Sequence, residues 1–112
     1  MSIIRSLIFL FIIATVFAIQ PLDVFSESMF SDGSKIEIQW YEKEGLILTK
    51  HVCFNYLEDE KKYRECRDKA EDYFEEECEF YESKMKSTPQ KYRSMYEPEL
   101  EKFCTANEQY RP

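Results

Sequence analysis

Residues 58–86, EDEKKYRECRDKAEDYFEEECEFYESKMK, contain neither glycine nor proline and are rich in the helix formers Glu, Lys and Arg. On a helical wheel of about 100° per residue with Glu71 at zero, its apolar and aromatic residues gather between about 180° and 340°. They are Tyr63, Cys66, Ala70, Tyr73, Phe74, Cys78, Phe80, Tyr81 and Met85. This periodicity predicts one long amphipathic helix over residues 58–86.

The densest group of carboxylates lies within that run, where residues 70–82 hold seven acidic residues and no basic one. Six of them fall between about 0° and 140°, which is the solvated side of the helix: Glu71, Asp72, Glu75, Glu76, Glu79 and Glu82. Glu77 is the exception, because it lies near 240° on the apolar side. We expect Glu77 to be partly buried and paired with Lys84 or Lys102, the alternative being an anchor inside a ligand cavity.

The residues after the long helix predict one or two short helices that fold back on it. Ser87-Thr88-Pro89 supplies a cap and a proline at the first helical position, which predicts a short helix over 89–96. Glu97-Pro98 starts a second helix, in which Leu100, Phe103 and Cys104 share one stripe. Asn107 is a suitable terminator for it.

On the N-terminal side, residues 35–52, KIEIQWYEKEGLILTKHV, alternate as a β-hairpin does. A type I turn over residues 42–45, with Gly45 left-handed, sets the register. The resulting cross-strand pairs are Trp40 with Leu48, Ile38 with Lys50, and Ile36 with Val52. Because a two-stranded ribbon is not stable alone, its apolar face is expected to pack on the long helix.

The first 18 residues, MSIIRSLIFLFIIATVFA, have the pattern of a secretory signal peptide cleaved after Ala18. The apolar run is shorter than the ~20 residues that cross a bilayer, and a retained signal anchor is the alternative. Residues 19–34 hold a proline, a glycine and four serines without a sustained period. They predict a flexible N-terminal segment or an arm that orders on binding, ahead of a single small domain over residues 35–112.

Four cysteines, at positions 53, 66, 78 and 104, are expected to form two disulfides in an oxidising compartment. Cys66 and Cys78 would lie about 18 Å apart on one helix, which exceeds the ~7 Å between bridged Cα atoms. Cys53 is too close to the helix start to reach Cys78, about 30 Å along it. The remaining pattern is Cys53 with Cys66 and Cys78 with Cys104. A helix break between Cys66 and Cys78 would reopen the other patterns, and an intermolecular disulfide is a further alternative.

Charge and residue inventory limit the function classes. Without Arg5 of the signal peptide, 14 basic face 22 acidic residues, so nucleic acid and anionic membrane surfaces are unfavourable partners. The only histidine, His51, is expected opposite Glu37 in the hairpin, and no nucleophile–base constellation is present. A straight helix splays its carboxylates, which disfavours a metal site. We therefore expect no enzyme, no cofactor and no metal.

Two binding functions remain. The first is a secreted, extracellular, acidic module, monomeric and without a membrane span once the signal is removed, that docks an extracellular protein with a basic surface. Its possible binding surface is Glu71, Glu75, Glu79 and Glu82. The second is a small carrier whose cavity, lined by Trp40, Phe74, Phe80 and Phe103, holds an apolar ligand. The expected fold is α+β, mainly α: a hairpin on a long amphipathic helix, short C-terminal helices and two disulfides.

Overall fold

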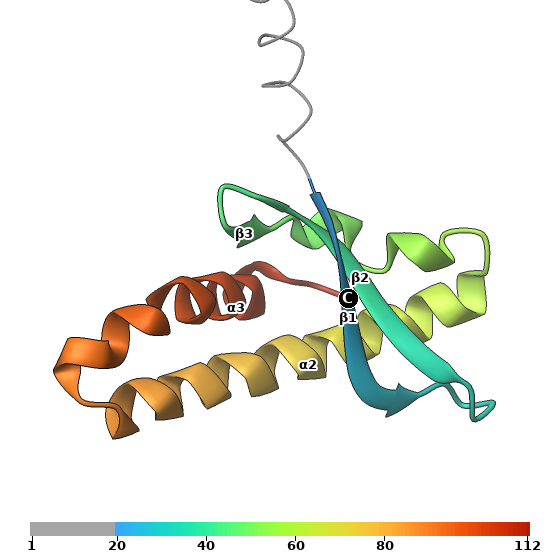
Figure 1. Cartoon of the computed structure of the whole chain (residues 1–112). Coiled ribbons are helices and arrows are strands. Elements are labelled where there is room, and N and C mark those ends of the chain that lie inside the picture. The colour runs from blue at the N-terminus through green and yellow to red at the C-terminus, as the bar shows by residue number, and fades with distance from the viewer. Residues whose placement is uncertain (1–19) are drawn as a thin grey trace, which may run out of the picture.

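The computed structural model describes residues 20–112, so the predicted signal peptide over 1–18 lies outside the described residues. A three-stranded antiparallel sheet crosses one long helix, and a shorter C-terminal helix runs back beside it (Figure 1). The fold is α+β and mainly helical, as predicted. In chain order the elements are β1 Gln20–Met29, β2 Lys35–Lys43, β3 Leu46–Ile47, the 3₁₀ helices η1 Thr49–His51 and η2 Phe54–Tyr56, α2 Glu60–Ser87, the 3₁₀ helix η3 Gln90–Met95, and α3 Glu97–Gln109.

Helix α2 matches the predicted helix to within two residues at each end. It begins where the Asp59 side chain accepts a hydrogen bond from the Lys62 backbone N–H, which satisfies one of the free donors of the first turn. Its buried residues are Cys66, Ala70, Phe74 and Cys78, all from the apolar side of the wheel. Phe80, at the edge of that side, is 49% exposed and lies outside the core.

The β2–β3 hairpin is present, but the predicted register is wrong. Glu44 and Gly45 both have positive φ, at 53° and 78°, and they form a two-residue turn of the kind that suits the twist of a hairpin. Glu42 therefore pairs with Ile47 and Lys43 with Leu46, a shift of one residue from the predicted pairing. Because such a shift exchanges the two faces of a strand, Ile47 is buried in place of Leu48.

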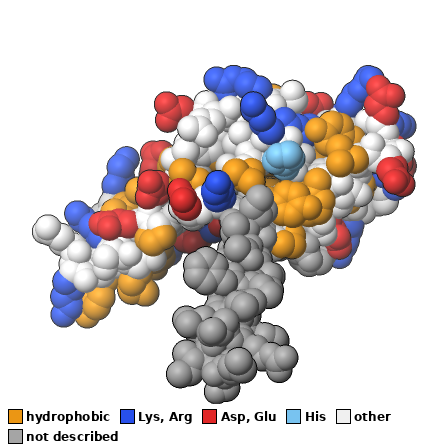
Figure 2. Space-filling model, turned by 90° about the horizontal axis from the view of Figure 1, so that it is seen from above, with side chains coloured by type: hydrophobic (Ala, Val, Ile, Leu, Met, Phe, Trp, Pro, Cys, Tyr) orange, Lys and Arg blue, Asp and Glu red, His pale blue; other side chains and the backbone are white. Residues whose placement is uncertain are grey.

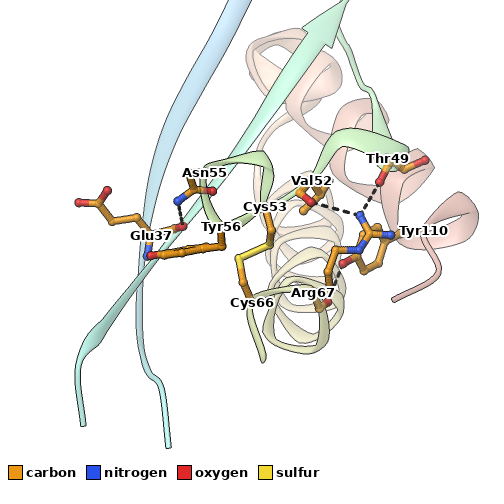
Figure 3. Close-up of a disulfide and its surroundings, with 9 residues drawn as sticks. All are labelled: Glu37, Thr49, Val52, Cys53, Asn55, Tyr56, Cys66, Arg67 and Tyr110. Carbon is orange, nitrogen blue, oxygen red and sulfur yellow. Dashed lines mark hydrogen bonds between the residues drawn. A yellow bond between two sulfur atoms is a disulfide. The ribbon is translucent and has the colours of Figure 1, made fainter. Parts of the chain in front are cut away.

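Strand β3 ends after two residues, yet the edge of β2 stays hydrogen-bonded beyond it. The loop that carries η1 and η2 supplies backbone and side-chain partners in place of a strand, two of which Figure 3 shows. They are Leu48 N to Tyr41 O (2.8 Å), Cys53 N to Gln39 O (2.8 Å), Asn55 Nδ2 to Glu37 O (2.9 Å) and Glu37 N to Tyr56 Oη (3.1 Å). His51 consequently lies in η1, near the Tyr41 ring, and not opposite Glu37 as predicted.

The other edge of β2 pairs with β1, which the sequence did not predict. Residues 20–25 pair with residues 42–37 in antiparallel register, and an irregularity separates these pairs from Met29 with Lys35. The sequence pattern of residues 19–34 predicted no strand, yet Gln20–Met29 forms one, because pairing with the free edge of β2 overrides local composition. The flexibility of this segment stays a prediction.

The core lies between the sheet, α2 and α3. Trp40 from β2 contacts Phe74 from α2 and Phe103 from α3, with ring centroids 5.6 Å and 6.2 Å apart. Both predicted disulfides are confirmed: the Cα atoms are 6.0 Å apart in Cys53–Cys66 and 4.7 Å apart in Cys78–Cys104. One fastens the loop after the hairpin to the N-terminal half of α2, and the other fastens α3 to its C-terminal half.

The C-terminal region differs from the prediction in detail. The short helix predicted over 89–96 is the 3₁₀ helix η3, and α3 begins at Glu97 with a proline in its first turn. Helix α3 continues to Gln109, beyond the predicted terminator Asn107. None of the helices within residues 20–112 has the length and apolar character that a bilayer crossing needs.

Arg67 ties the C-terminal end of the chain to the loop after the hairpin (Figure 3). Its guanidinium donates to the carbonyls of Thr49 (2.8 Å), Val52 (3.3 Å) and Arg111 (2.6 Å), and it lies 4.5 Å from the centroid of the Tyr110 ring. The Tyr110 hydroxyl donates in return to the Arg67 carbonyl at 2.6 Å. Burial raises the pKa of Tyr110, so its hydroxyl remains a donor at physiological pH.

Replacement of Arg67 tests this junction. Arg67→Met keeps an unbranched apolar stem but leaves three carbonyls without their charged donor, so we expect the free energy of unfolding to fall by about 2 kcal/mol. Arg64→Met is the control, because Arg64 is exposed and only pairs with Glu60 one turn away, a pair worth about 0.5 kcal/mol. Urea unfolding with intact disulfides measures both variants. Equal losses would show that Arg67 has no special role.

Candidate functional site

Four carboxylates of the predicted binding surface form a row along α2, which we name the acidic row: Glu71, Glu75, Glu79 and Glu82. All four are exposed. The ion pairs found among residues 20–112 are Glu60–Arg64, Glu42–Lys102 and Glu99–Lys102, so the acidic row takes part in none of them. Like charges one helical turn apart cost a few tenths of a kcal/mol per pair, ~0.2–0.5. Repulsion between Glu71 and Glu75, and between Glu75 and Glu79, therefore costs the helix some stability.

The helix that carries the acidic row is fixed by core packing and by two disulfides. Ala70, Phe74 and Cys78, on the apolar side of α2, are buried. The disulfides at Cys66 and Cys78 attach the same helix to the loop after the hairpin and to α3. A partner that meets this row would therefore order exposed side chains only, and not backbone, which keeps the entropic cost of binding low.

Glu82 differs from the rest of the row because it contacts the second disulfide. Its Oε1 atom lies 3.0 Å from Cys78 Sγ and 3.7 Å from Cys104 Sγ. Two sulfurs and a carboxylate at this spacing resemble part of a metal site. The sulfurs are bonded to each other, however, and so carry neither a proton nor the thiolate charge that a metal needs. The cluster is a carboxylate packed against a disulfide.

The predicted partner of Glu77 is wrong. Lys102 Nζ lies 3.3 Å from Glu42 and 3.2 Å from Glu99, and Glu77 makes no ion pair within the described part of the chain. Partial burial, together with the nearby carboxylates of Glu76 and Glu99, raises the pKa of Glu77 above its usual value. Lys102 pairs with Glu42 and not with Glu77, because β2 places Glu42 beside α3. A helical wheel of α2 alone does not show this contact.

Three of the four residues assigned to a carrier cavity pack against one another. Trp40, Phe74 and Phe103 are buried, and the two phenylalanine rings lie 6.5 Å apart between centroids. The fourth, Phe80, is exposed. The open hollows at η2 and beside Glu65 are lined by other residues. In this structure the aromatic cluster is the core itself.

The structure has a second charged surface that the sequence pattern did not predict. Residues 83–96, which we name the basic tip, hold four cations and no carboxylate: Lys84, Lys86, Lys91 and Arg93. They form the turn from α2 through η3, at the end of the molecule farthest from the sheet (Figure 1). Figure 2 shows Lys and Arg side chains beside hydrophobic ones at this end, with Asp or Glu side chains bordering them. The four cations of residues 83–96 are visible in the sequence, but the net negative charge of the whole chain hides this local positive charge.

Comparison of the chain with protein-family models, with curated proteins and with solved structures finds no match. Function is therefore inferred from the surfaces of residues 20–112. Two of these surfaces carry segregated charge, the acidic row on the side of α2 and the basic tip at its C-terminal end.

Glu82 is expected to protect the Cys78–Cys104 disulfide from reduction. An attacking thiolate is negative, and a carboxylate about 4 Å from its path repels it by about 1 kcal/mol even in water. Glu82→Gln should therefore speed reduction of this bond by dithiothreitol about fivefold at low salt. Timed alkylation and mass mapping measure the rate, with Glu79→Gln as control. Equal rates in the two variants would contradict the protective role.

Glu77 is expected to lower stability at neutral pH. Because its folded-state pKa is raised, its stabilising contribution is fully present below the usual carboxyl pKa of 4.5 and is lost as pH rises through the folded-state value. Glu77→Gln should thus raise the free energy of unfolding at pH 7 by about 0.5 kcal/mol, since solvent screens a partly exposed group. The gain should vanish below about pH 4. Urea unfolding across this range tests it; a pH-independent gain, like that of any helix-surface change, would contradict it.

Proposed function

We propose that this chain is a small secreted, disulfide-stabilised acidic module that binds an extracellular protein through the acidic row of α2. The observation that carries the proposal is a row of exposed carboxylates without ion-pair partners in the described region, held on a helix that two disulfides fix. The row costs the helix stability, and a basic partner would turn that cost into attraction. The partner surface is therefore rich in Lys and Arg.

The electrostatics suit a protein partner more than a small ligand. Carboxylates spread over consecutive turns of a straight helix diverge, and they match an extended surface better than a compact ion. They also attract a basic surface before contact, which raises the association rate and makes it fall with salt. The two disulfides support secretion, because such bonds persist in oxidising compartments.

An apolar-ligand carrier receives less support. A carrier encloses its ligand in a cavity, whereas Trp40, Phe74 and Phe103 fill the space between the sheet and the helices with their own rings. We therefore keep the carrier as an outcome of the test. Native mass spectrometry of protein from secreting cells would reveal it as added mass that is lost on denaturation.

The test neutralises the acidic row without disturbing the second disulfide. Glu71→Gln/Glu75→Gln/Glu79→Gln removes three charges and leaves Glu82 in place. Relief of like-charge repulsion should raise the free energy of unfolding by about 0.5 kcal/mol in total, so lost binding would not reflect unfolding. We expect binding to purified extracellular domains with basic surfaces to weaken at least about tenfold, mainly through a slower association rate.

The matched control is Glu58→Gln/Glu101→Gln/Glu108→Gln, which removes the same charge from exposed positions outside the row. Binding that survives in the control and is lost in the row variant supports the proposal. Equal loss of binding in both variants would show that only the net charge of the chain matters, and it would overturn the proposal. Binding that neither variant changes would assign recognition to another surface.

A further inference from the structure

The basic tip combines its cations with exposed apolar side chains. Met95 is 67% exposed and Tyr92 is 48% exposed, both in η3. The Lys91 ammonium lies 4.9 Å from the centroid of the Tyr92 ring. Phe80, 49% exposed on the last part of α2, has Lys84 at 5.5 Å from its ring centroid. Cations alternate with apolar groups over this end of the molecule.

The overall negative charge does not cancel the local charge of the tip. Glu71 and Glu75 lie about 22 Å and 16 Å along α2 from Lys86, at 1.5 Å per residue. The Debye length at physiological salt is about 8 Å, so these carboxylates are largely screened from the tip. The nearest acids along the chain, Glu82 and Glu97, border the tip and offset up to two of its four positive charges, which leaves it locally positive.

We infer that the basic tip docks on an anionic lipid surface. Its four cations are complementary to acidic headgroups, and Tyr92 and Met95 are of the kind that enters the interfacial region. The tip is the projecting end of the α2–α3 hairpin (Figure 1), so it can meet a flat, deformable surface without a matching cavity. An acidic protein would pair with the cations, but it would not account for the exposed side chain of Met95. This inference departs, at the tip alone, from the expectation that the net negative charge of the chain makes anionic membranes poor partners.

The test uses the oxidised chain purified from secreting cells and flotation with lipid vesicles. Vesicles of phosphatidylcholine with about one third phosphatidylserine should bind at least about tenfold more protein than phosphatidylcholine alone, and added salt should weaken binding. Lys86→Glu/Lys91→Glu should abolish the preference. Lys43→Glu/Lys50→Glu, with the same charge change at exposed positions away from the tip, should retain it. Met95→Ser should weaken binding about threefold, through loss of apolar contact with the interface.

Three results would overturn the inference. The first is equal binding to both vesicle types at low salt. The second is equal loss in the tip variant and its control, which would reflect net charge alone. The third is retention on immobilised polyglutamate without vesicle binding, which would assign the tip to an acidic protein. Circular dichroism of each variant verifies that the fold is intact, since the substituted side chains are exposed.

Discussion

The structure depends on one helix that is held at two points by disulfides. Cys66 and Cys78 lie about 18 Å apart along α2, and each is bonded to a different part of the chain. The first bond draws in the loop after the hairpin, so that β2 delivers Trp40 to Phe74. The second draws in α3, which delivers Phe103 to the same cluster. A small domain with a modest aromatic core gains its fixed geometry from these two bonds.

Structural features that depend on a single helix, such as its length and its apolar side, were predictable from the sequence. Features that depend on how two helices or strands meet were harder to predict. The amphipathic period of about 3.6 residues predicted α2, and the rise of 1.5 Å per residue then limited which cysteines could meet. The hairpin register was missed because Glu44, a residue with no glycine-like freedom, adopts positive φ beside Gly45. Strand β1 was missed because its pairing partner is the free edge of β2 and not a local turn signal.

The candidate site shows the same division. Exposure of Glu71, Glu75 and Glu79 follows from their angular position on α2, and the wheel predicted it. The surroundings of Glu77 depend instead on where Lys102 points, and Lys102 is drawn to Glu42 by the arrangement of β2 and α3. The contact of Glu82 with the second disulfide likewise requires both helices to be in place. The basic tip needed no structure, only a count of charge by segment.

Charge is segregated along α2, with the acidic row on the side of the helix and the basic tip at its end. Glu71 and Glu75 lie about 22 Å and 16 Å along the helix from Lys86, beyond the screening length of about 8 Å, whereas Glu82 lies about 6 Å from it. At physiological salt the tip is therefore largely screened from Glu71 and Glu75 but not from Glu82. At low salt the two fields overlap, and the whole acidic chain is repelled by any anionic surface except along the direction of the tip. With the tip against such a surface, the side of α2 with the acidic row stays exposed to solvent.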